Sequence, residues 1–359
     1  MKLKFWHADL RLAHTWTIAR GSTDVFRVIL VELTSADGTV GLGEASPVAR
    51  YDESADTVEA YLRRVDTRQI SFSDVPASMR YLDSIAPANM SAKCALNVAL
   101  LDGAARIARK PLYDFLGLGF RDSHHVTSFS IGIAEPGEIR EKVLAAENFP
   151  VLKLKVGSRD DKANLAALRE VAPKKRVRVD ANEGWVTKEH ALEMIEWLAS
   201  DGHVELIEQP MPATALASDL AWLKQRSPLP LFGDESYHSA TDAERCAECF
   251  HGVNVKLVKT GGVSGAFDAL RAARAVGLKT MIGCMIETSV LITAAAHLAE
   301  LCDCLDLDGN LLITNDPFTG VVAENGLLSL AHSLELYGLQ VTYRNVRQVL
   351  PPRAGIKFL

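Results

Sequence analysis

The sequence lacks any long run of basic residues. The longest is KKR at 174–176, and 45 Asp and Glu residues outnumber 39 Lys and Arg, giving a net charge of −6. Surfaces that bind nucleic acid are strongly basic, so this composition argues against a nucleic-acid partner and favours a small-molecule ligand. At 359 residues and 48% hydrophobic content, the chain is long enough for a large core and two domains.

Long uncharged apolar segments are also missing. The amino-terminal sequence MKLKFWHADLRLAH carries charges throughout and has no uninterrupted apolar core, which a signal peptide would need. The longest apolar stretch, 281–301, contains Glu287 and is interpreted as a strand followed by a buried helix rather than a membrane span. We therefore expect a protein that has no membrane partner and stays in the cytoplasm.

Cysteine is sparse. The six cysteines do not form a dense framework, as expected in a reducing compartment. Cys246 and Cys249 make a CxxC motif, but it lies in a predicted helix, and no second pair of cysteines or histidines is placed to complete a zinc site. We interpret both as plain thiols.

What the sequence does contain is a series of short apolar runs that end in charged residues. Five of these charges lie 25, 28, 26 and 22 positions apart, about the length of one strand, one helix and two loops. The five are Lys155, Asp180, Glu208, Asp234 and Lys256. With a first strand predicted at 125–133, a seventh at 279–285 and a last one at CLDLDG, the pattern predicts an α/β fold, a (β/α)8-type TIM barrel.

The first 120 residues have a different pattern, which predicts an α+β capping domain. Strands at 3–12 and 25–45 precede a helix at about 56–66 and a second, buried helix that begins at a Ser91 cap. Two polar and aromatic segments, 14–24 and 47–54, are longer than turns require, so they are either structural loops or lids over the barrel mouth. The predicted division is 1–122 for the cap with these lids, 123–325 for the barrel, and 326–359 for a segment that returns a strand to the cap.

The charged strand ends predict a metal site. In a parallel barrel the carboxyl ends of all strands open on one face, so Asp180, Glu208 and Asp234 would lie together. Like charges in one cavity repel unless a cation lies between them, and oxygen ligands alone favour Mg²⁺, with Mn²⁺ possible, over zinc. The alternative interpretation is an ion network with the neighbouring lysines.

Two lysines flank these carboxylates in the strand order. Lys155 lies on the strand before them and Lys256 on the strand after them. A nearby divalent ion or second ammonium disfavours protonation of a lysine, so either could act as a base near neutral pH. This pair suits removal of a proton from one face of a carbon and delivery to the other. Lys259 has the other strand parity and is expected to be solvated.

The motifs KxK, DAN, EQP, DES and KxxKTGG, in this order, resemble the enolase superfamily in its muconate lactonizing enzyme subgroup. The DxD pair Asp306 and Asp308, with IARGS at 18–22, is similar to the dipeptide epimerases of that superfamily. The resemblance covers essentially the whole chain. It implies a capping domain built from both termini, a modified barrel between them and a homo-oligomeric assembly.

The resemblance also implies an activity. The enzyme would be an isomerase that converts L,L-dipeptides to L,D-dipeptides by 1,1-proton transfer at the α carbon of the C-terminal residue. Lys155 and Lys256 would be the acid/base pair, and Mg²⁺ would be held by the three carboxylates named above. Removing an α proton beside a carboxylate makes a dianion that needs cationic stabilisation, so Lys153 would neutralise it, while Asp306 and Asp308 would bind the substrate's ammonium group.

One departure from the family concerns the substrate side chain. Members that act on L-Ala-D/L-Glu carry IARGSR, whose last arginine meets the glutamate, whereas this chain has IARGST with Thr23. Asp24, Asp52 and Glu53 add negative charge to the two lid segments. We therefore expect a cationic, neutral or hydrophobic side chain rather than glutamate, in a site that includes Arg20, Thr23 and Asp24.

Three alternatives stay open from the sequence. N-acylamino acid racemase and o-succinylbenzoate synthase share the metal ligands and both lysines but need no DxD pair for an ammonium group. A cycloisomerase is a weaker possibility within the same fold. A non-catalytic binding barrel is a different class of protein, and the intact lysine pair argues against it.

Overall fold

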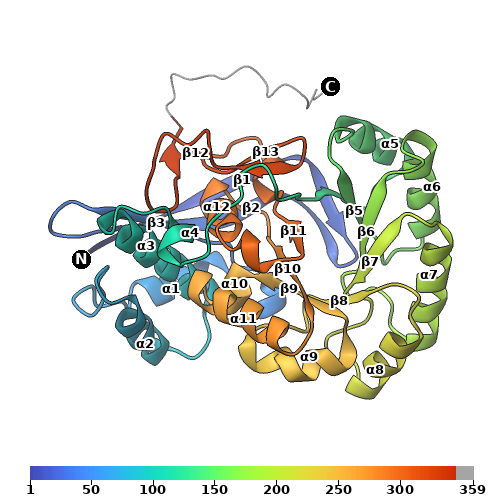
Figure 1. Ribbon diagram of the computed structural model, residues 1–359, viewed down its shortest axis with the longest axis horizontal. Coiled ribbons are helices and arrows are strands. Elements are labelled where there is room, and N and C mark those ends of the chain that lie inside the picture. The colour runs from blue at the N-terminus through green and yellow to red at the C-terminus, as the bar shows by residue number, and fades with distance from the viewer. Residues whose placement is uncertain (345–359) are drawn as a thin grey trace.

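Eight parallel strands form the centre of the computed structural model, which describes residues 1–344. They pair in chain order as one sheet (Figure 1). The strands are β4 (Phe129–Ile131), β5 (Val151–Lys155), β6 (Arg176–Asp180), β7 (Val204–Glu208), β8 (Leu231–Gly233), β9 (Gly252–Lys256), β10 (Lys279–Gly283) and β11 (Cys304–Asp306). Thr127 and Leu305 form a parallel bridge, and Ser128 N donates to Leu305 O at 3.2 Å. The first and last strands therefore meet, and the predicted barrel is confirmed.

The register of the barrel strands aligns their charged ends. Lys155 pairs with Asp180, and Asp180 pairs with Glu208 on the next strand. On the far side of the barrel, Gly283 pairs with both Lys256 and Asp306. Because the strands are parallel and in step, these residues all lie at one end of the barrel, as the even spacing predicted.

Helices follow the strands and lie around the outside of the barrel in Figure 1. They are α5 (Pro136–Ala145), α6 (Asp161–Val171), α7 (Lys188–Ser200), α8 (Ala217–Arg226), α9 (Ala243–Cys249), α10 (Leu257–Thr260), α11 (Val263–Ala275) and α12 (Ser289–Ala296). Every residue of α12 is buried, which confirms the predicted strand and buried helix in the longest apolar stretch. Within residues 1–344 no helix is long and apolar enough to cross a membrane.

The amino-terminal part is an antiparallel sheet covered by helices. Its elements are β1 (Lys2–Ile18), β2 (Gly21–Thr34), β3 (Val40–Ala45), α1 (Ala55–Leu62), α2 (Val75–Ile85), α3 (Met90–Ile107) and α4 (Leu112–Phe115). Gly41 and Gly43 allow α3 to lie directly on β3, because a Cβ at Gly43 would lie 1.9 Å from Ala95 O. The helix begins one residue before the predicted Ser91 cap. Ser91 N is instead satisfied by the Glu53 carboxylate at 3.0 Å.

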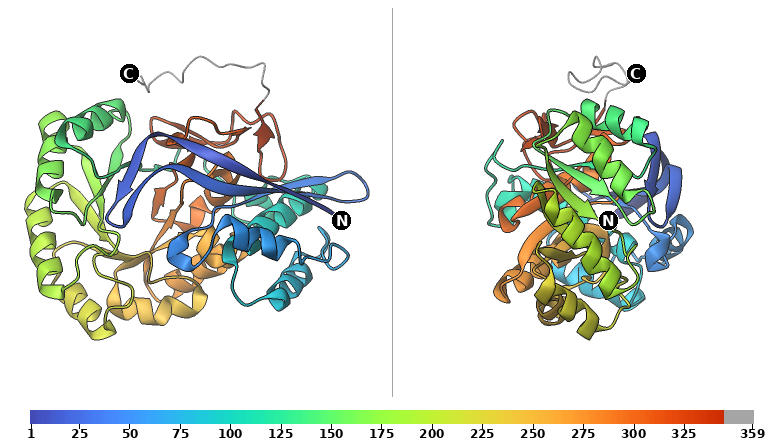
Figure 2. Two further views of the ribbon diagram at one scale, coloured as in Figure 1. Left: turned by 180° about the vertical axis from the view of Figure 1, so that it is seen from behind. Right: turned by 90° about the vertical axis from the view of Figure 1, so that its right-hand side faces the viewer.

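The largest difference from the predicted elements is in segment 14–24, which is not a loop. Strand β1 continues to Ile18 and pairs with β2, which begins at Gly21, so the segment is the end of a long hairpin. The register shifts between Arg11 and Trp16. This irregularity interrupts the alternation of apolar and polar residues by which a strand is recognised in sequence. Figure 2 shows the hairpin crossing the molecule, with its turn beside the first strands of the barrel.

The described part of the carboxyl-terminal segment contacts the cap but adds no strand to the cap sheet. Its strand β15 (Thr342–Tyr343) pairs with β12 (Phe318–Thr319) and does not join the cap sheet, while β13 (Val322–Glu324) pairs with β14 (Leu327–Ser329). The segment reaches the cap through other contacts. The Asp102 carboxylate of α3 accepts from Leu42 N on β3 at 2.9 Å and from Leu339 N at 2.8 Å, and Leu112 N at the start of α4 donates to Gly338 O at 2.8 Å. Residues 345–359 of the predicted segment lie outside the described part.

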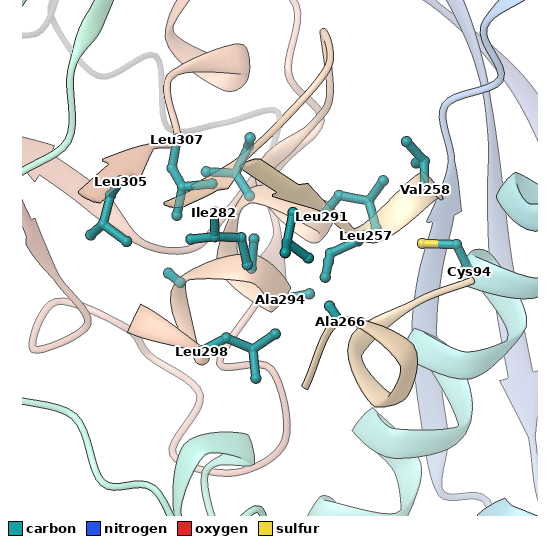
Figure 3. Packing of buried hydrophobic residues seen from close by; sticks show 14 of the residues in the cluster. Cys94, Leu257, Val258, Ala266, Ile282, Leu291, Ala294, Leu298, Leu305 and Leu307 are labelled. Carbon is teal, nitrogen blue, oxygen red and sulfur yellow. The ribbon is translucent and has the colours of Figure 1, made fainter. Parts of the chain in front are cut away.

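The barrel and the cap share one hydrophobic core. Figure 3 shows side chains of β10, α12 and the β11 region together, with Cys94 of α3 pointing toward Leu257 and Val258. Cys246 and Cys249 are also buried and unbonded.

A buried carboxylate, Glu44, joins β3 to the barrel loop before α12. Its oxygens accept from Thr288 N at 2.9 Å and from the Thr288 hydroxyl at 2.5 Å. Burial, together with the nearby charge of Glu287 and a smaller contribution from Asp316, raises the pKa of Glu44 to about 8. Glu44 therefore holds its proton at neutral pH in the folded protein.

This raised pKa predicts a stability that depends on pH. As pH rises from about 4.5 to about 8, the unfolded chain releases the Glu44 proton while the folded chain retains it, so Glu44 lowers the free energy of unfolding across that window. Glu44→Gln removes this penalty, and its stability relative to wild type should improve by about 2–4 kcal/mol between pH 5 and pH 8. Urea unfolding of both proteins across this range measures the difference. The exposed substitution Glu141→Gln is the control, and equal pH slopes for wild type and Glu44→Gln would contradict the prediction.

Candidate active site

Three carboxylates meet at the open end of the barrel. Asp180 ends β6, Glu208 ends β7 and Asp234 follows β8; one oxygen from each lies within 4.8 Å of the others. All three side chains are buried. The three carboxylates therefore lie close together, as expected for residues at the carboxyl ends of parallel strands.

Three lysines that the sequence predicted for the site contact these carboxylates from different sides. Lys155 Nζ lies 2.7 Å from Asp180, and Lys256 Nζ lies 2.8 Å from Asp234. Their strands, β5 and β9, are separated by β6, β7 and β8. Lys153 is more deeply buried, with Nζ 3.2 Å from Asp180 and 2.9 Å from Glu208. Lys155 and Lys256 thus approach the carboxylate cluster from opposite sides.

Lys259 was expected to be solvated, and this expectation is wrong. It is buried, and its Nζ donates to Asp234 Oδ1 at 2.6 Å and to the Asp234 carbonyl oxygen. The chain enters α10 directly after Lys256, so helical rather than strand periodicity fixes the direction of the Lys259 side chain. A lysine three positions after a strand end can therefore return to the site.

The electrostatics of the cluster suit a bound cation. Burial acts to raise the pKa of Asp180, but Lys155 and Lys153 outweigh it and hold the value below its usual range. Burial and the Asp180 charge raise the pKa of Glu208 to about 8. Glu208 Oε2 accepts no well-aligned hydrogen bond from residues 1–344, although Lys153 Nζ lies 2.9 Å away. The donor set is oxygen only, which fits Mg²⁺ or Mn²⁺.

Asp306 and Asp308, at the end of β11, have different partners. Asp306 accepts from Lys153 Nζ and from the Ser128 hydroxyl, both at 2.7 Å. Asp308 accepts from Ser130 N at 2.6 Å, and burial with the Asp306 charge raises its pKa to about 6. Asp308 is the less compensated of the two carboxylates, so a cation near it would be favoured.

A cavity of about 500 Å³ lies between the cap and the barrel mouth. Among the predicted site residues, its walls include Lys153, Lys155, Lys256, Asp306, Asp308, Arg20 and Thr23. Both predicted lid segments contribute to it, through 20–23 of the hairpin and 47–50 of the second segment. The lysines, the DxD pair and the lids therefore share one cavity.

Asp24 is the predicted substrate residue that the structure does not bring into this cavity. It follows Thr23 on β2, and neighbouring strand residues point to opposite faces. Thr23 lines the cavity, whereas Asp24 is exposed and accepts from the Thr15 hydroxyl at 2.7 Å. Glu53 is likewise used elsewhere, because its carboxylate satisfies Ser91 N at the start of α3.

Arg20 lines the cavity but is already paired. Its guanidinium lies 2.8 Å from Glu235 and 3.2 Å from Glu183. Arg50 of the second lid segment also pairs with Glu183, at 2.8 Å. No motif in the sequence marks Glu183, Glu235 or Arg50 as residues of the site. The only available signal was that the two glutamates follow metal-ligand candidates closely, in DANE and DE.

Two family models match the chain. The model for the mandelate racemase/muconate lactonizing enzyme N-terminal domain matches residues 3–117, and the enolase C-terminal domain-like model matches residues 138–322. Between them, these matches include the cap sheet and the barrel strands from β5 to β11.

Similar proteins of known name and structure cover nearly the whole chain. A Pedosphaera parvula protein named L-Ala-D/L-amino acid epimerase is 67% identical over 344 residues, 95% of this chain and 99% of the relative. A Bacteroides thetaiotaomicron L-Ala-D/L-Glu epimerase is 39% identical over 334 residues, 92% of this chain and 85% of the relative. The dipeptide epimerase of Cytophaga hutchinsonii, complexed with Mg and D-Ala-L-Val, has a TM-score of 0.88 and 29% identity and covers 96% of both chains.

Proposed function

The chain belongs to the mandelate racemase/muconate lactonizing enzyme family of the enolase superfamily, and from this premise we propose that it is an isomerase that epimerises dipeptides at the α carbon of the C-terminal residue. The observation that carries the proposal is that Lys155 and Lys256 contact the carboxylate cluster from opposite sides and both line one cavity, whose wall also includes the less compensated carboxylate of Asp308. The two lysines would transfer the proton, and the Asp308 carboxylate would bind an ammonium group of the substrate.

Lys155 and Lys256 are proposed as the two acid/base groups. A 1,1-proton transfer needs a base on one face of the α carbon and an acid on the other. Lys155 comes from β5 and Lys256 from β9, and both line the cavity. The first lysine removes the α proton from one epimer, and the second protonates the opposite face. In the reverse direction their roles exchange.

Asp180, Glu208 and Asp234 are proposed to hold Mg²⁺, with Mn²⁺ as a substitute. When bound, the ion would supply positive charge for the substrate carboxylate and for the enolate that forms from it. Lys153 adds a second cationic centre, since its buried ammonium lies 2.7 Å from Asp306 and 2.9 Å from Glu208. This charge matters because loss of the α proton leaves a dianion, whose two negative charges are spread over the carboxylate oxygens and the α carbon.

Asp308, with Asp306 beside it, is proposed to bind the free ammonium group of the dipeptide. A charge-assisted hydrogen bond to a buried carboxylate is strong, and Asp308 has a backbone amide but no lysine among its hydrogen-bond donors within residues 1–344. An N-acylamino acid or an o-succinylbenzoate precursor has no ammonium group at this position. These substrates would leave Asp308 without a cation, so they are the less favoured alternative.

The C-terminal side chain is proposed to be neutral and apolar. Arg20 and Arg50, the two guanidinium groups of the lid walls, are already neutralised by Glu183 and Glu235. The rest of that wall includes Ile18, Phe26, Val48, Met285 and Ile286. A buried substrate carboxylate would have to displace an existing ion pair, which is unfavourable.

Hydrogen exchange at the α carbon tests the function and the specificity together. The protein and Mg²⁺ are incubated in D₂O with pooled L-Ala-L-Xaa dipeptides, and deuterium gain and epimer formation are scored by mass spectrometry and chiral chromatography. We expect L-Ala-L-Leu and L-Ala-L-Met to react at least about tenfold faster than L-Ala-L-Glu. Faster turnover of L-Ala-L-Glu would contradict the apolar assignment.

Other outcomes of the same assay separate the alternatives. Exchange in N-succinylamino acids but in no dipeptide would identify an N-acylamino acid racemase. Absence of exchange in every compound would favour the non-catalytic binding barrel. The cytoplasmic location and the homo-oligomeric assembly stay predictions from the sequence.

A further inference from the structure

We propose that Glu183 is a positioning residue whose single carboxylate fastens both lid segments of the cap to the barrel mouth. It would hold the hairpin turn and the 47–50 segment in the places that shape the cavity. Glu183 is not among the residues that line the cavity. Its effect on the reaction would therefore pass through Arg20 and Arg50, which do line it.

The contact with the second lid segment is a two-pronged ion pair. Arg50 Nε donates to Glu183 Oε2 and Arg50 Nη2 donates to Oε1, both at 2.8 Å. Planar guanidinium and carboxylate groups paired in this way fix each other's orientation as well as their separation. Arg50 belongs to the short 3₁₀ turn Ala49–Tyr51, so this pair fixes the position of that turn.

The contact with the hairpin uses the same carboxylate. Arg20 Nη1 lies 3.2 Å from Glu183 Oε2, 3.0 Å from the Asn182 carbonyl oxygen and 2.8 Å from Glu235 Oε1. Arg20 stands at the turn between β1 and β2. Arg20 of the hairpin turn and Arg50 of the second lid segment, 30 residues apart in the sequence, therefore contact the same carboxylate, that of Glu183.

The barrel holds Glu183 in an unusual backbone conformation. Asn182 and Glu183 both have positive φ, 43° and 70°, which costs roughly 1 kcal/mol or more for a residue other than glycine. Glu183 N donates to Gln209 O at 2.9 Å, and Ala213 N donates to Glu183 Oε1 at 2.8 Å. Contacts from the loop after β7 therefore hold Glu183 in this strained conformation. In that conformation its carboxylate contacts Arg20 and Arg50 of the cap.

The hairpin turn is also in close contact with the barrel at this point. A Cβ on Gly157 would lie 3.0 Å from the Ala19 side chain, and one on Gly184 would lie 2.6 Å from the Gly157 Cα. Ile133 N donates to Thr17 O at 2.9 Å. These neutral contacts place the turn, while the Glu183 ion pairs are the charged interactions that link it to the other lid segment. Loss of Glu183 should therefore loosen both segments together.

Trypsin reports on both segments directly, because each contains an arginine that ends a potential cleavage site. The bonds are Arg20–Gly21 and Arg50–Tyr51. Proteolysis of a folded protein follows the population of the locally open state when reclosing is fast. In Glu183→Gln we expect cleavage at both bonds to accelerate about tenfold or more relative to wild type, as measured by mass spectrometry of timed digests.

Asp201→Asn is the matched control. Asp201 also accepts a two-pronged pair from an arginine, Arg169, with both distances 2.7 Å, and it accepts from the backbone amide of His203 at 3.2 Å. It lies at the end of α7 and not in the cavity wall. Both substitutions should lower the melting temperature to a similar extent, but only Glu183→Gln should expose the two lid bonds.

A kinetic measurement completes the test, and this part rests on the proposed epimerisation. With the best dipeptide from the exchange screen, Glu183→Gln should raise KM about tenfold and change kcat less than about threefold, because the lid walls bind ground state and transition state alike. Arg50→Gln should give the same pattern, and the double variant should be no worse than Glu183→Gln. Proteolysis needs no substrate, so a wrong assignment of the reaction would leave that result intact. Unchanged cleavage at both bonds in Glu183→Gln, with the Asp201→Asn control behaving as expected, would overturn the proposal.

Discussion

Replacing Lys256 by methionine is expected to lower kcat/KM for dipeptide epimerisation by about 10⁴-fold or more, since one of the two obligatory proton-transfer groups is removed. The same variant should still exchange the α hydrogen of one epimer with D₂O. Lys155 can remove and return a proton on its own face of the α carbon, but inversion needs an acid on the other face. Lys155→Met should show the mirror-image behaviour and exchange only the opposite epimer.

This complementary pattern separates loss of a catalytic group from general damage to the site. Each variant is incubated with both epimers of one dipeptide in D₂O, and deuterium content is measured for each epimer separately. Lys188→Met is a suitable control, because Lys188 is also paired with a carboxylate, Asp219 at 2.6 Å, but lies outside the cavity. Exchange of the same epimer by both cavity variants would contradict assignment of the two lysines to opposite faces.

Much of this site could be predicted because a parallel barrel converts sequence spacing into spatial proximity. Each charged residue stands at the end of a buried strand, and the parallel registers bring those ends to one edge. The proximity of Lys155, Asp180 and Glu208 therefore follows from the spacing of their strands in the sequence. The residues proposed for the chemistry therefore lie in the part of the fold that strand spacing predicts.

Other parts could not be predicted because they depend on interruptions of strand periodicity. Lys259 was misplaced because β9 changes to a helix directly after Lys256. Segment 14–24 is not recognisable as the end of a hairpin, rather than a loop or lid, because the register shifts between Arg11 and Trp16. Without knowing that β2 begins at Gly21, strand alternation cannot be used to separate Thr23 from Asp24. The sequence therefore predicts both in the substrate site, although only Thr23 lines the cavity.

The ion pairs of Glu183 were hidden for a different reason. Arg20, Arg50 and Glu183 are separated by 30 and 133 positions, and nothing periodic connects them. Their meeting depends on how the cap is placed on the barrel. A sequence pattern within one domain contains no information about that contact.

Substitution of Glu208 by glutamine is expected to weaken Mg²⁺ binding and to lower kcat/KM by about 10³-fold or more, because the substrate enolate loses part of its electrostatic stabilisation. Glutamine keeps an oxygen at the site but cannot ionise, so it removes the negative charge that Glu208 would contribute as a ligand of the cation. Calorimetric titration with Mg²⁺, and with Mn²⁺ by electron paramagnetic resonance, measures the loss of binding without any substrate. Chelation of wild type should abolish activity, and added Mg²⁺ should restore it.

Glu205→Gln provides the control for this prediction on the same strand. Glu205 lies near the opposite end of β7, where it pairs with Arg178 at 3.2 Å, far from the carboxylate cluster along the strand. It should leave Mg²⁺ affinity unchanged. In the absence of metal, burial and the Asp180 charge raise the pKa of Glu208 to about 8, so near neutral pH Glu208→Gln replaces one neutral side chain by another, and the variant should remain folded by circular dichroism. Wild-type Mg²⁺ affinity in a folded Glu208→Gln variant would exclude Glu208 as a ligand and leave the carboxylates as an ion network with the lysines.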